Sequence, residues 1–133
     1  MISKRLLTIK INKEVSKILP SNSDEIKDIL YALLQLIEIG KVTTYKLLAE
    51  CLGITPRYVG KILKENSLPI VIPCHRVIKS DLSIGGYTIN GRGNPSFKRK
   101  LLALEGVRFR SKNRVRKEDV IATIDELLFK GQI

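Results

Sequence analysis

The chain has 133 residues, 44% of them apolar, which suits one domain with an ordinary core and excludes a compositionally disordered protein. Two cysteines and one histidine are too few for a structural zinc site, and no apolar run approaches the ~20 residues that span a bilayer. The net charge is +11, and residues 92–117 carry +9 of it, which favours a polyanion such as nucleic acid as the partner over a merely solvated basic surface.

The first predicted elements are a short strand over residues 6–11 and a long amphipathic helix. Residues 1–7 are too interrupted by charge for a secretion signal, so we expect an intracellular protein, in the cytoplasm or nucleoid, with reduced thiols. Asn22 and Ser23 are helix caps, and Gly40 is a stop. Between them, apolar residues recur at three- and four-residue spacing: Ile26, Ile29, Leu30, Leu33, Leu34 and Ile37.

Two shorter helices follow. The first begins after Thr43 or Thr44 and ends at Gly53. The second begins at Thr55, because a capping residue followed by proline is typical of a helix start. Its basic side chains share one face: Arg57, Lys61 and Lys64. Two short helices joined by a tight turn, the second basic, predict a helix-turn-helix.

The second half of the chain alternates loops and helices. Prolines bracket the apolar residues 68–73, which therefore cannot be helical, and we expect a buried extended segment. Glycines in 84–91 predict a hairpin or loop. A helix is expected from Asn94 and Pro95 to Gly106, and a last helix over 118–130.

Cys74 is the candidate nucleophile. It follows the proline-bracketed segment and precedes His75 and Arg76, either of which favours a thiolate. The alternative is a buried cysteine that packs as a small apolar side chain. Cys51 fits that alternative, since it lies in a helical apolar stripe, and we expect it to be structural.

The run Ile72-Pro73-Cys74-His75-Arg76-Val77-Ile78 resembles the active-site motif of the O6-alkylguanine-DNA alkyltransferases (methylated-DNA–protein-cysteine methyltransferases). Further blocks resemble the family in the same order: residues 40–45, 56–60, Asn66, 85–87 and 101–106. The resemblance covers residues 24–107. It implies a mainly α, winged-helix-like domain with short β elements that repairs DNA by moving an alkyl group irreversibly from O6-alkylguanine to Cys74, once per molecule.

The resemblance also implies a catalytic set. His75 is the base that relays the thiol proton through a water to Glu105. Asn66 fixes the segment before Cys74 and polarises the site. Tyr45 donates a proton to the leaving guanine.

Substrate contacts follow from the same resemblance. The backbone near Val77 and Thr88 reads the base edges, and Tyr87 helps to form the pocket wall. The target atom is inaccessible in a stacked duplex, so the base is flipped out. The residues expected at the DNA are Arg57, which fills the gap, and Tyr58, Lys61 and Arg76. The duplex is bound at its minor groove with little sequence specificity, by a monomer without metal, cofactor or membrane.

The chain departs from the family pattern at both ends. We expect a short N-terminal remnant over 1–23 in place of a larger domain, then the alkyltransferase domain over 24–107. The resemblance implies no role for residues 108–133, a basic extension with a helix, and we expect the basic segment 92–117 to contact phosphates.

Three alternatives stay open. Alkyltransferase-like sensors keep the fold but lack the cysteine, so the presence of Cys74 argues against them. A helix-turn-helix regulator would bind the major groove as a sequence-specific dimer, and it leaves Cys74, His75 and Glu105 unexplained. A Cys–His hydrolase would need a recognisable oxyanion motif, which we do not find in this sequence.

Overall fold

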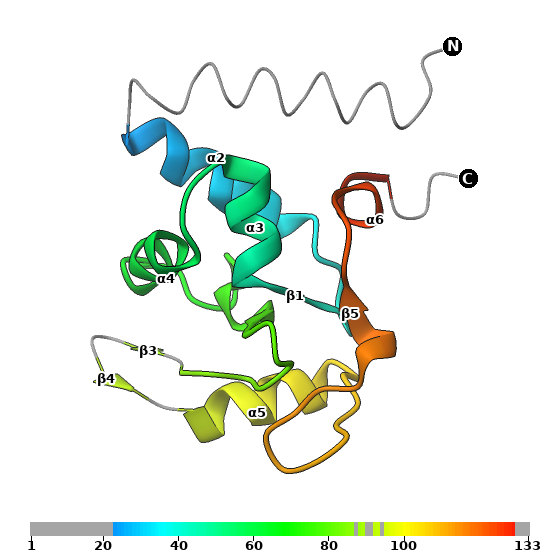
Figure 1. The fold of residues 1–133 in the computed structure, drawn as a ribbon. Helices are drawn as coiled ribbons and strands as arrows, with labels where there is room; N and C mark the ends of the chain where they lie inside the picture. Colours follow the sequence, from blue (N-terminus) through cyan, green and yellow to red (C-terminus); the bar gives the residue numbers. More distant parts are fainter. Residues whose placement is uncertain (1–22, 87, 90–91, 94, 130–133) are drawn as a thin grey trace.

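The computed structural model describes residues 23–86, 88–89, 92–93 and 95–129, in which helices predominate over strands (Figure 1). The helices are α2 (Ser23–Gln35), α3 (Tyr45–Leu52), α4 (Pro56–Lys64), α5 (Pro95–Leu104) and α6 (Ile124–Phe129). The strands are β1 (Val42–Thr44), β2 (Val77–Ile78), β3 (Thr88–Ile89), β4 (Arg92–Gly93) and β5 (Val120–Ile121), and two 3₁₀ turns span Cys74–Arg76 and Lys117–Asp119. The prediction of a mainly helical fold with short β elements is confirmed.

A three-stranded parallel sheet joins segments that are distant in sequence. β1 is the central strand, with Thr43 opposite Val77 of β2 and Val42 opposite Val120 of β5. β1 runs directly into α3, and β2 begins immediately after the 3₁₀ turn Cys74–Arg76. The pairing of β1 with β2 therefore brings the turn that carries Cys74 close to the start of α3.

The two helices predicted to form a helix-turn-helix lie where the sequence indicates. The Thr44 hydroxyl accepts a 3.0 Å hydrogen bond from the backbone N–H of Leu47, and Gly53 ends α3 in the left-handed conformation at φ 68°. The Thr55 hydroxyl caps α4, whose first residue is Pro56. The apolar faces of α3 and α4 are buried in one core cluster with α2. Figure 1 shows these three helices at one end of the molecule and α5 at the other.

Two expectations about loops are wrong. The first helix ends at Gln35 rather than at Gly40, because the chain tightens through a 3.0 Å bond from the Leu36 N–H to the Leu33 carbonyl. The segment 68–73 is not a buried extended stretch, since only its last residue, Pro73, is buried. The Ile72 N–H bonds to the Leu68 carbonyl at 2.9 Å, and the turn so closed leaves Val71 74% exposed.

The expected helix over 118–130 is only partly present. Its first residues form a 3₁₀ turn and β5, and α6 begins at Ile124. The two residues of β5 pair with β1. The helical periodicity within the segment does not reveal this partner. Val115, Ile121, Leu127 and Phe129 are buried, so the extension contributes to the core rather than hanging from it.

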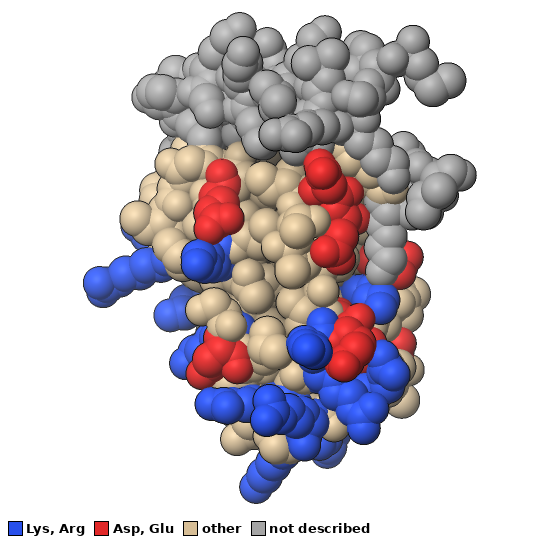
Figure 2. Space-filling model, turned by 45° about the vertical axis from the view of Figure 1, so that its right-hand side comes forward, with Lys and Arg blue, Asp and Glu red and all other residues tan. Residues whose placement is uncertain are grey.

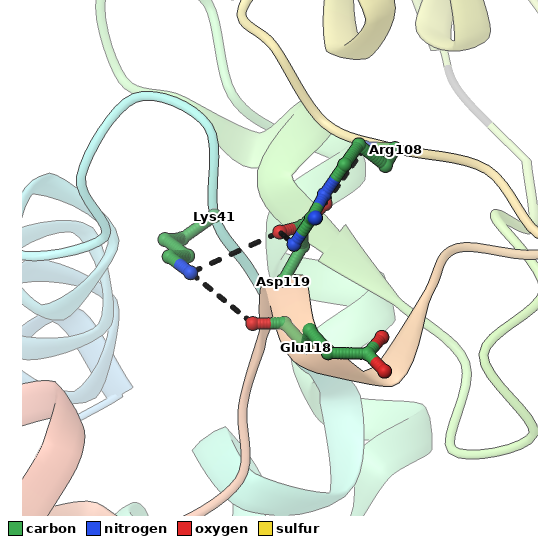
Figure 3. Close-up of polar contacts among 4 residues, drawn as sticks. All are labelled: Lys41, Arg108, Glu118 and Asp119. Carbon is green, nitrogen blue, oxygen red and sulfur yellow. Dashed lines mark hydrogen bonds and ion pairs between the residues drawn. The ribbon is translucent and has the colours of Figure 1, made fainter.

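Asp119 connects this C-terminal segment to the rest of the fold through hydrogen bonds and ion pairs (Figure 3). Its carboxylate accepts hydrogen bonds from the backbone N–H of Arg108 at 2.7 Å and from the Arg108 guanidinium at 2.9 and 3.2 Å. Lys41, just before β1, lies 3.8 Å from the same carboxylate and donates to the Glu118 carbonyl at 3.1 Å. Asp119 is 4% exposed, so these contacts compensate the burial of its charge.

The hairpin or loop expected over 84–91 is confirmed in part: β3 pairs antiparallel with β4, and the hairpin extends beyond these bounds to Gly93. α5 begins at Pro95 and Gly106 follows its end at φ 94°, again as expected. The strand expected over 6–11 lies outside the described residues. Among the helices of the described ranges, none has the length and apolarity needed to cross a membrane.

Candidate active site

Cys74 lies at a fixed turn in the middle of the structure. Its backbone N–H bonds to the Ile72 carbonyl at 2.8 Å, and the Arg76 N–H bonds to the Pro73 carbonyl at 3.0 Å. The side chain is free of any disulfide and 7% exposed, and it lies in the core cluster shared by α2, α3 and α4. These bonds fix the backbone that carries the thiol.

Asn66 holds the loop that leads to Cys74. Its amide nitrogen donates to the Ile72 carbonyl at 2.9 Å, and its amide oxygen accepts from the Leu68 N–H at 2.9 Å. The side chain therefore bonds both ends of the exposed turn and fixes the residue two places before Cys74. The resemblance implied this holding role, although the segment it holds is a turn.

Glu105 meets both residues that follow Cys74. The Nε2 atom of His75 lies 3.1 Å from Oε2 of Glu105, and the Arg76 guanidinium donates to both carboxylate oxygens at 2.9 and 2.8 Å. Arg76 also donates to the Ile37 carbonyl at 2.7 Å. Arg76 was expected at the DNA; these bonds engage its guanidinium within the protein, and its contact with DNA stays a prediction.

The pKa values of His75 and Glu105 favour a neutral imidazole beside an ionised carboxylate. Burial lowers the pKa of His75 below its usual value, and the opposing influence of Glu105 does not overcome it. Burial acts to raise the pKa of Glu105, but hydrogen bonds from Arg76 and His75 outweigh it and lower that pKa. At neutral pH, His75 is thus able to accept a proton, with a carboxylate behind it that stabilises positive charge.

Tyr45 is the first residue of α3, and the pairing of β1 with β2 brings it near the turn that carries Cys74. Burial raises the pKa of its phenol, and the negative charge of an ionised Cys74 raises it further. A phenol with a raised pKa stays protonated at neutral pH and can donate a proton when negative charge develops nearby.

Lys98 is a site residue that the sequence reasoning missed. Its side chain is fully buried, and its ammonium donates to the Val77 carbonyl at 2.6 Å and to the Gly86 carbonyl at 3.3 Å. The ammonium also lies 6.0 Å from the ring centre of Tyr45. Burial lowers the pKa of Lys98 to about 8, while the charge of Cys74 acts to raise it. The available signal was its position, one helical turn before the buried Leu102.

A groove of about 1020 Å³ runs along α4 and reaches Tyr45. Five Lys or Arg residues and one acid line it, and the residues expected at DNA are among them: Arg57, Tyr58 and Lys61. All three are exposed, whereas Cys74 is not in the lining. Tyr45 connects the two, since it lines the groove and its phenol is influenced by Cys74.

The residues expected to read the base are only partly described. Val77 begins β2, and the ammonium of Lys98 binds its carbonyl. Thr88 lies in β3 opposite Gly93. Tyr87 lies outside the described residues.

The basic segment 92–117 is not uniformly available for phosphates. Lys98 is buried, so its ammonium does not face solvent. Arg108 is paired with Asp119 but its side chain is 54% exposed, and its contact with phosphate stays a prediction. The others that lie in described ranges and are exposed are Lys100, Arg110, Lys112, Arg114, Arg116 and Lys117. Figure 2 shows Lys and Arg side chains gathered over the lower half of the molecule, where α5 and the segment after it lie in Figure 1.

Comparison with protein families identifies the region that contains this site. Residues 25–107 match the model described as "6-O-methylguanine DNA methyltransferase, DNA binding domain". A methylated-DNA–protein-cysteine methyltransferase of Pyrobaculum aerophilum is 48% identical over 111 residues, which are 83% of this chain and 72% of that one. The protein of the same name from Saccharolobus solfataricus is 52% identical over 69 residues, which are 52% of this chain and 42% of its own length.

Solved structures agree with the sequence relatives. Atl1 of S. pombe, in complex with damaged DNA containing O6-carboxymethylguanine, superposes with a TM-score of 0.62 at 27% identity, over 75% of this chain and 97% of that one. The O6-methylguanine-DNA methyltransferase of Pyrococcus kodakaraensis gives a TM-score of 0.54 at 32% identity, over 80% of this chain and 66% of its own.

Proposed function

The chain belongs to the 6-O-methylguanine DNA methyltransferase family, and from this premise we propose that it repairs O6-alkylguanine in DNA by transferring the alkyl group to Cys74. The observation that carries the proposal is the contact between His75 and Glu105 at the turn that carries Cys74. Cys74 lies in a rigid turn followed by His75, whose imidazole is 3.1 Å from Glu105. Cys51, the other cysteine, lies in the apolar face of α3 and has no histidine beside it in the chain.

The proposed reaction begins with loss of the thiol proton. The proton passes from Cys74 through a water to His75, and Glu105 stabilises the positive charge that results. Arg76 holds both oxygens of Glu105 and keeps one of them at His75, so Arg76 is a positioning residue.

The thiolate then attacks the alkyl carbon. A sulfur–carbon bond forms, the bond between that carbon and O6 breaks, and its electron pair stays with the guanine. Tyr45 donates a proton to the guanine ring, which makes the purine a better leaving group. The thioether product has no route to regenerate the thiol in these residues, so each molecule acts once.

Lys98 supports the charge at this centre in our proposal. Its buried ammonium fixes the Val77 carbonyl, three residues after Cys74, and attraction to an ionised Cys74 acts to raise the pKa of Lys98. The backbone at Val77 and Thr88 would then read the edges of the base, with Tyr87 at the pocket wall.

The finer description of the fold belongs to this proposal as well. We assign α3 and α4 to a winged helix-turn-helix that binds the minor groove of duplex DNA with little sequence specificity. Its support is the cationic groove along α4, whose exposed Arg57 is available to fill the space of a flipped base. A monomer suffices, and a DNA substrate would place the protein at the nucleoid.

The test is Cys74→Ser, with Cys51→Ser as the matched control. Mass spectrometry after mixing with a duplex that contains O6-methylguanine should show one added methyl group on wild type and on the control, and none on Cys74→Ser. Cys74→Ser should still bind the damaged duplex, because the hydroxyl keeps the shape of the thiol but is not usefully ionised. Methyl transfer to Cys74→Ser at a rate near that of wild type would overturn the assignment.

A further inference from the structure

A second cavity adjoins the groove along α4, and its wall is cationic. It measures about 500 Å³ and is lined by three segments that are distant in sequence, represented by Lys79, Arg99 and Lys112. Each of these carries positive charge, and no acidic residue is in the lining. Lys79 also lines the groove, so the two cavities meet at that residue.

The cavity is built by specific bonds rather than by chance proximity of surface cations. The Arg99 Nε donates to the Lys112 carbonyl at 2.6 Å, and the Arg99 guanidinium lies 4.3 Å from the ring centre of Phe109. The carbonyl of the next residue, Asn113, accepts a 2.9 Å bond from the Ile84 N–H. The loop that carries Lys112 is therefore held at two successive carbonyls, which places its side chain at the cavity.

The negative charge of Asp81, which lines the groove along α4, is partly compensated by its neighbours. Asp81 is the one carboxylate in the lining of the groove, and the Arg114 guanidinium lies 4.0 Å from it. Ser83 also donates to Asp81 from its N–H and hydroxyl at 3.0 and 2.6 Å. These contacts reduce the repulsion that Asp81 would exert on an anion near Lys79.

We propose that this cavity binds a backbone phosphate of the same duplex that occupies the groove along α4. The ligand is a phosphodiester, whose unesterified oxygens face Lys79, Arg99 and Lys112. A duplex carries one charge per ~1.7 Å of its axis, so a duplex that lies over α4 and continues past Lys79 presents phosphates to the adjoining cavity. The inference rests on the proposed function only in taking DNA as the ligand.

The test measures how binding to an unmodified duplex depends on salt. Replacing Lys79, Arg99 or Lys112 singly by Gln should lower the slope of log K against log salt by about 0.9 for each phosphate that the variant no longer neutralises. Lys27→Gln, on α2 and outside the linings of both cavities and the basic segment 92–117, is the matched control and should keep the wild-type slope. Arg99→Lys keeps the positive charge but changes the group that bonds to the Lys112 carbonyl, so it separates loss of charge from disruption of the loop. Unchanged slopes in all three variants, or an equal fall in the control, would overturn the proposal.

A second arm locates the phosphate. We replace one backbone phosphate at a time by a neutral methylphosphonate. At one position the replacement should lower the DNA affinity of wild type to that of Lys112→Gln and leave the affinity of Lys112→Gln unchanged. Equal effects on both proteins at every position would contradict the site. Alkyl transfer to wild type from free O6-benzylguanine is measured in parallel, because this reaction tests the proposed function without DNA. Absence of transfer to wild type would count against the proposed function alone, whereas normal transfer with unchanged salt slopes would count against this cavity alone.

Discussion

The buried ammonium of Lys98 donates a 2.6 Å hydrogen bond to the carbonyl of Val77, three residues after Cys74. A fully buried lysine is rare, because taking its charge out of water is costly unless partners compensate. Here the partners are two backbone carbonyls, from Val77 and Gly86. The first of these bonds therefore joins α5 to the strand that follows the active-site turn.

Lys98→Met is expected to slow alkyl transfer at least tenfold with both damaged duplex and free O6-benzylguanine. Methionine keeps much of the length and the apolar stem of lysine but removes the charge beside Cys74 and frees the Val77 carbonyl. Single-turnover rates on the two substrates provide the measurement, and Lys100→Met is the exposed control on the same helix. An unchanged rate with both substrates would restrict Lys98 to a structural role.

The pH dependence of stability gives an independent readout of Lys98. Its pKa is lowered by burial to about 8 in the folded protein, so between pH 8 and roughly 10.4 the unfolded state binds more protons. The cost of burying the charge is fully present below pH 8 and disappears as the pH rises through this window. The free energy of unfolding of wild type should therefore rise relative to Lys98→Met as the pH increases from about 7 to about 10, as measured by urea denaturation. A constant difference would show that Lys98 does not titrate in this range.

Glu105→Gln is expected to slow transfer substantially while leaving DNA binding intact. The amide keeps the shape of the carboxylate but no longer stabilises a positive imidazole, and it pairs poorly with the Arg76 guanidinium. The pKa of Glu105 is lowered in the fold, so its contribution to stability is present above the usual glutamate pKa and is lost as the pH falls. The free energy of unfolding should therefore fall less steeply with decreasing pH in the variant than in wild type. Glu118→Gln, at an exposed position, is the control.

Arg57→Ala is expected to slow repair of duplex DNA by at least tenfold more than reaction with free O6-benzylguanine. Arg57 is exposed on the first turn of α4 and lines the groove, so we expect it to stabilise a flipped base rather than the chemistry. The ratio of the two rate constants is the measurement. Equal losses on both substrates would instead place Arg57 in the reaction or in the fold.

Cys51→Ala is expected to transfer alkyl groups at the wild-type rate and to lose about 1 kcal/mol of stability, the usual cost of a small cavity. Burial raises the pKa of the Cys51 thiol to about 11, so it is not a thiolate at neutral pH. Denaturation curves and transfer rates give the two readouts. Alkylation of Cys51 in wild type would undermine the assignment of Cys74.

The parts of the structure that the sequence predicts well are those specified by neighbouring residues. Thr44, Gly53, Thr55 and Pro56 set the ends of α3 and α4 through local caps, and each lies where expected. The C-terminal segment was harder to predict, because Val120 and Ile121 fit a helical stripe equally well and become a strand only when β1 is beside them. That partner is distant in sequence, and local periodicity contains no trace of it.

The candidate site divides in the same way. Cys74, His75, Glu105 and Asn66 follow from a motif, and the structure brings them into one region through bonds to the backbone and to one another. Arg76 was expected at the DNA from the resemblance, and Lys98 was expected to contact phosphates as part of the basic segment 92–117. Most arginines and lysines do lie at the surface. Their actual partners, Glu105 and Val77, become neighbours only after the sheet and α5 have assembled.

The position of β5 also determines when β1 can gain its second neighbouring strand during synthesis of the chain. β1 pairs with a strand whose residues leave the ribosome almost 80 positions later, as the register of Val42 with Val120 requires. Until then β1 has one open edge, which exposes unpaired backbone groups to other chains. Contacts between such distant residues form slowly, because a long loop must close first. β1, which leads into Tyr45 and pairs with the strand after Cys74, therefore obtains its second neighbour only after α5 has been made. A nascent chain that stops before β5 would lack that neighbour.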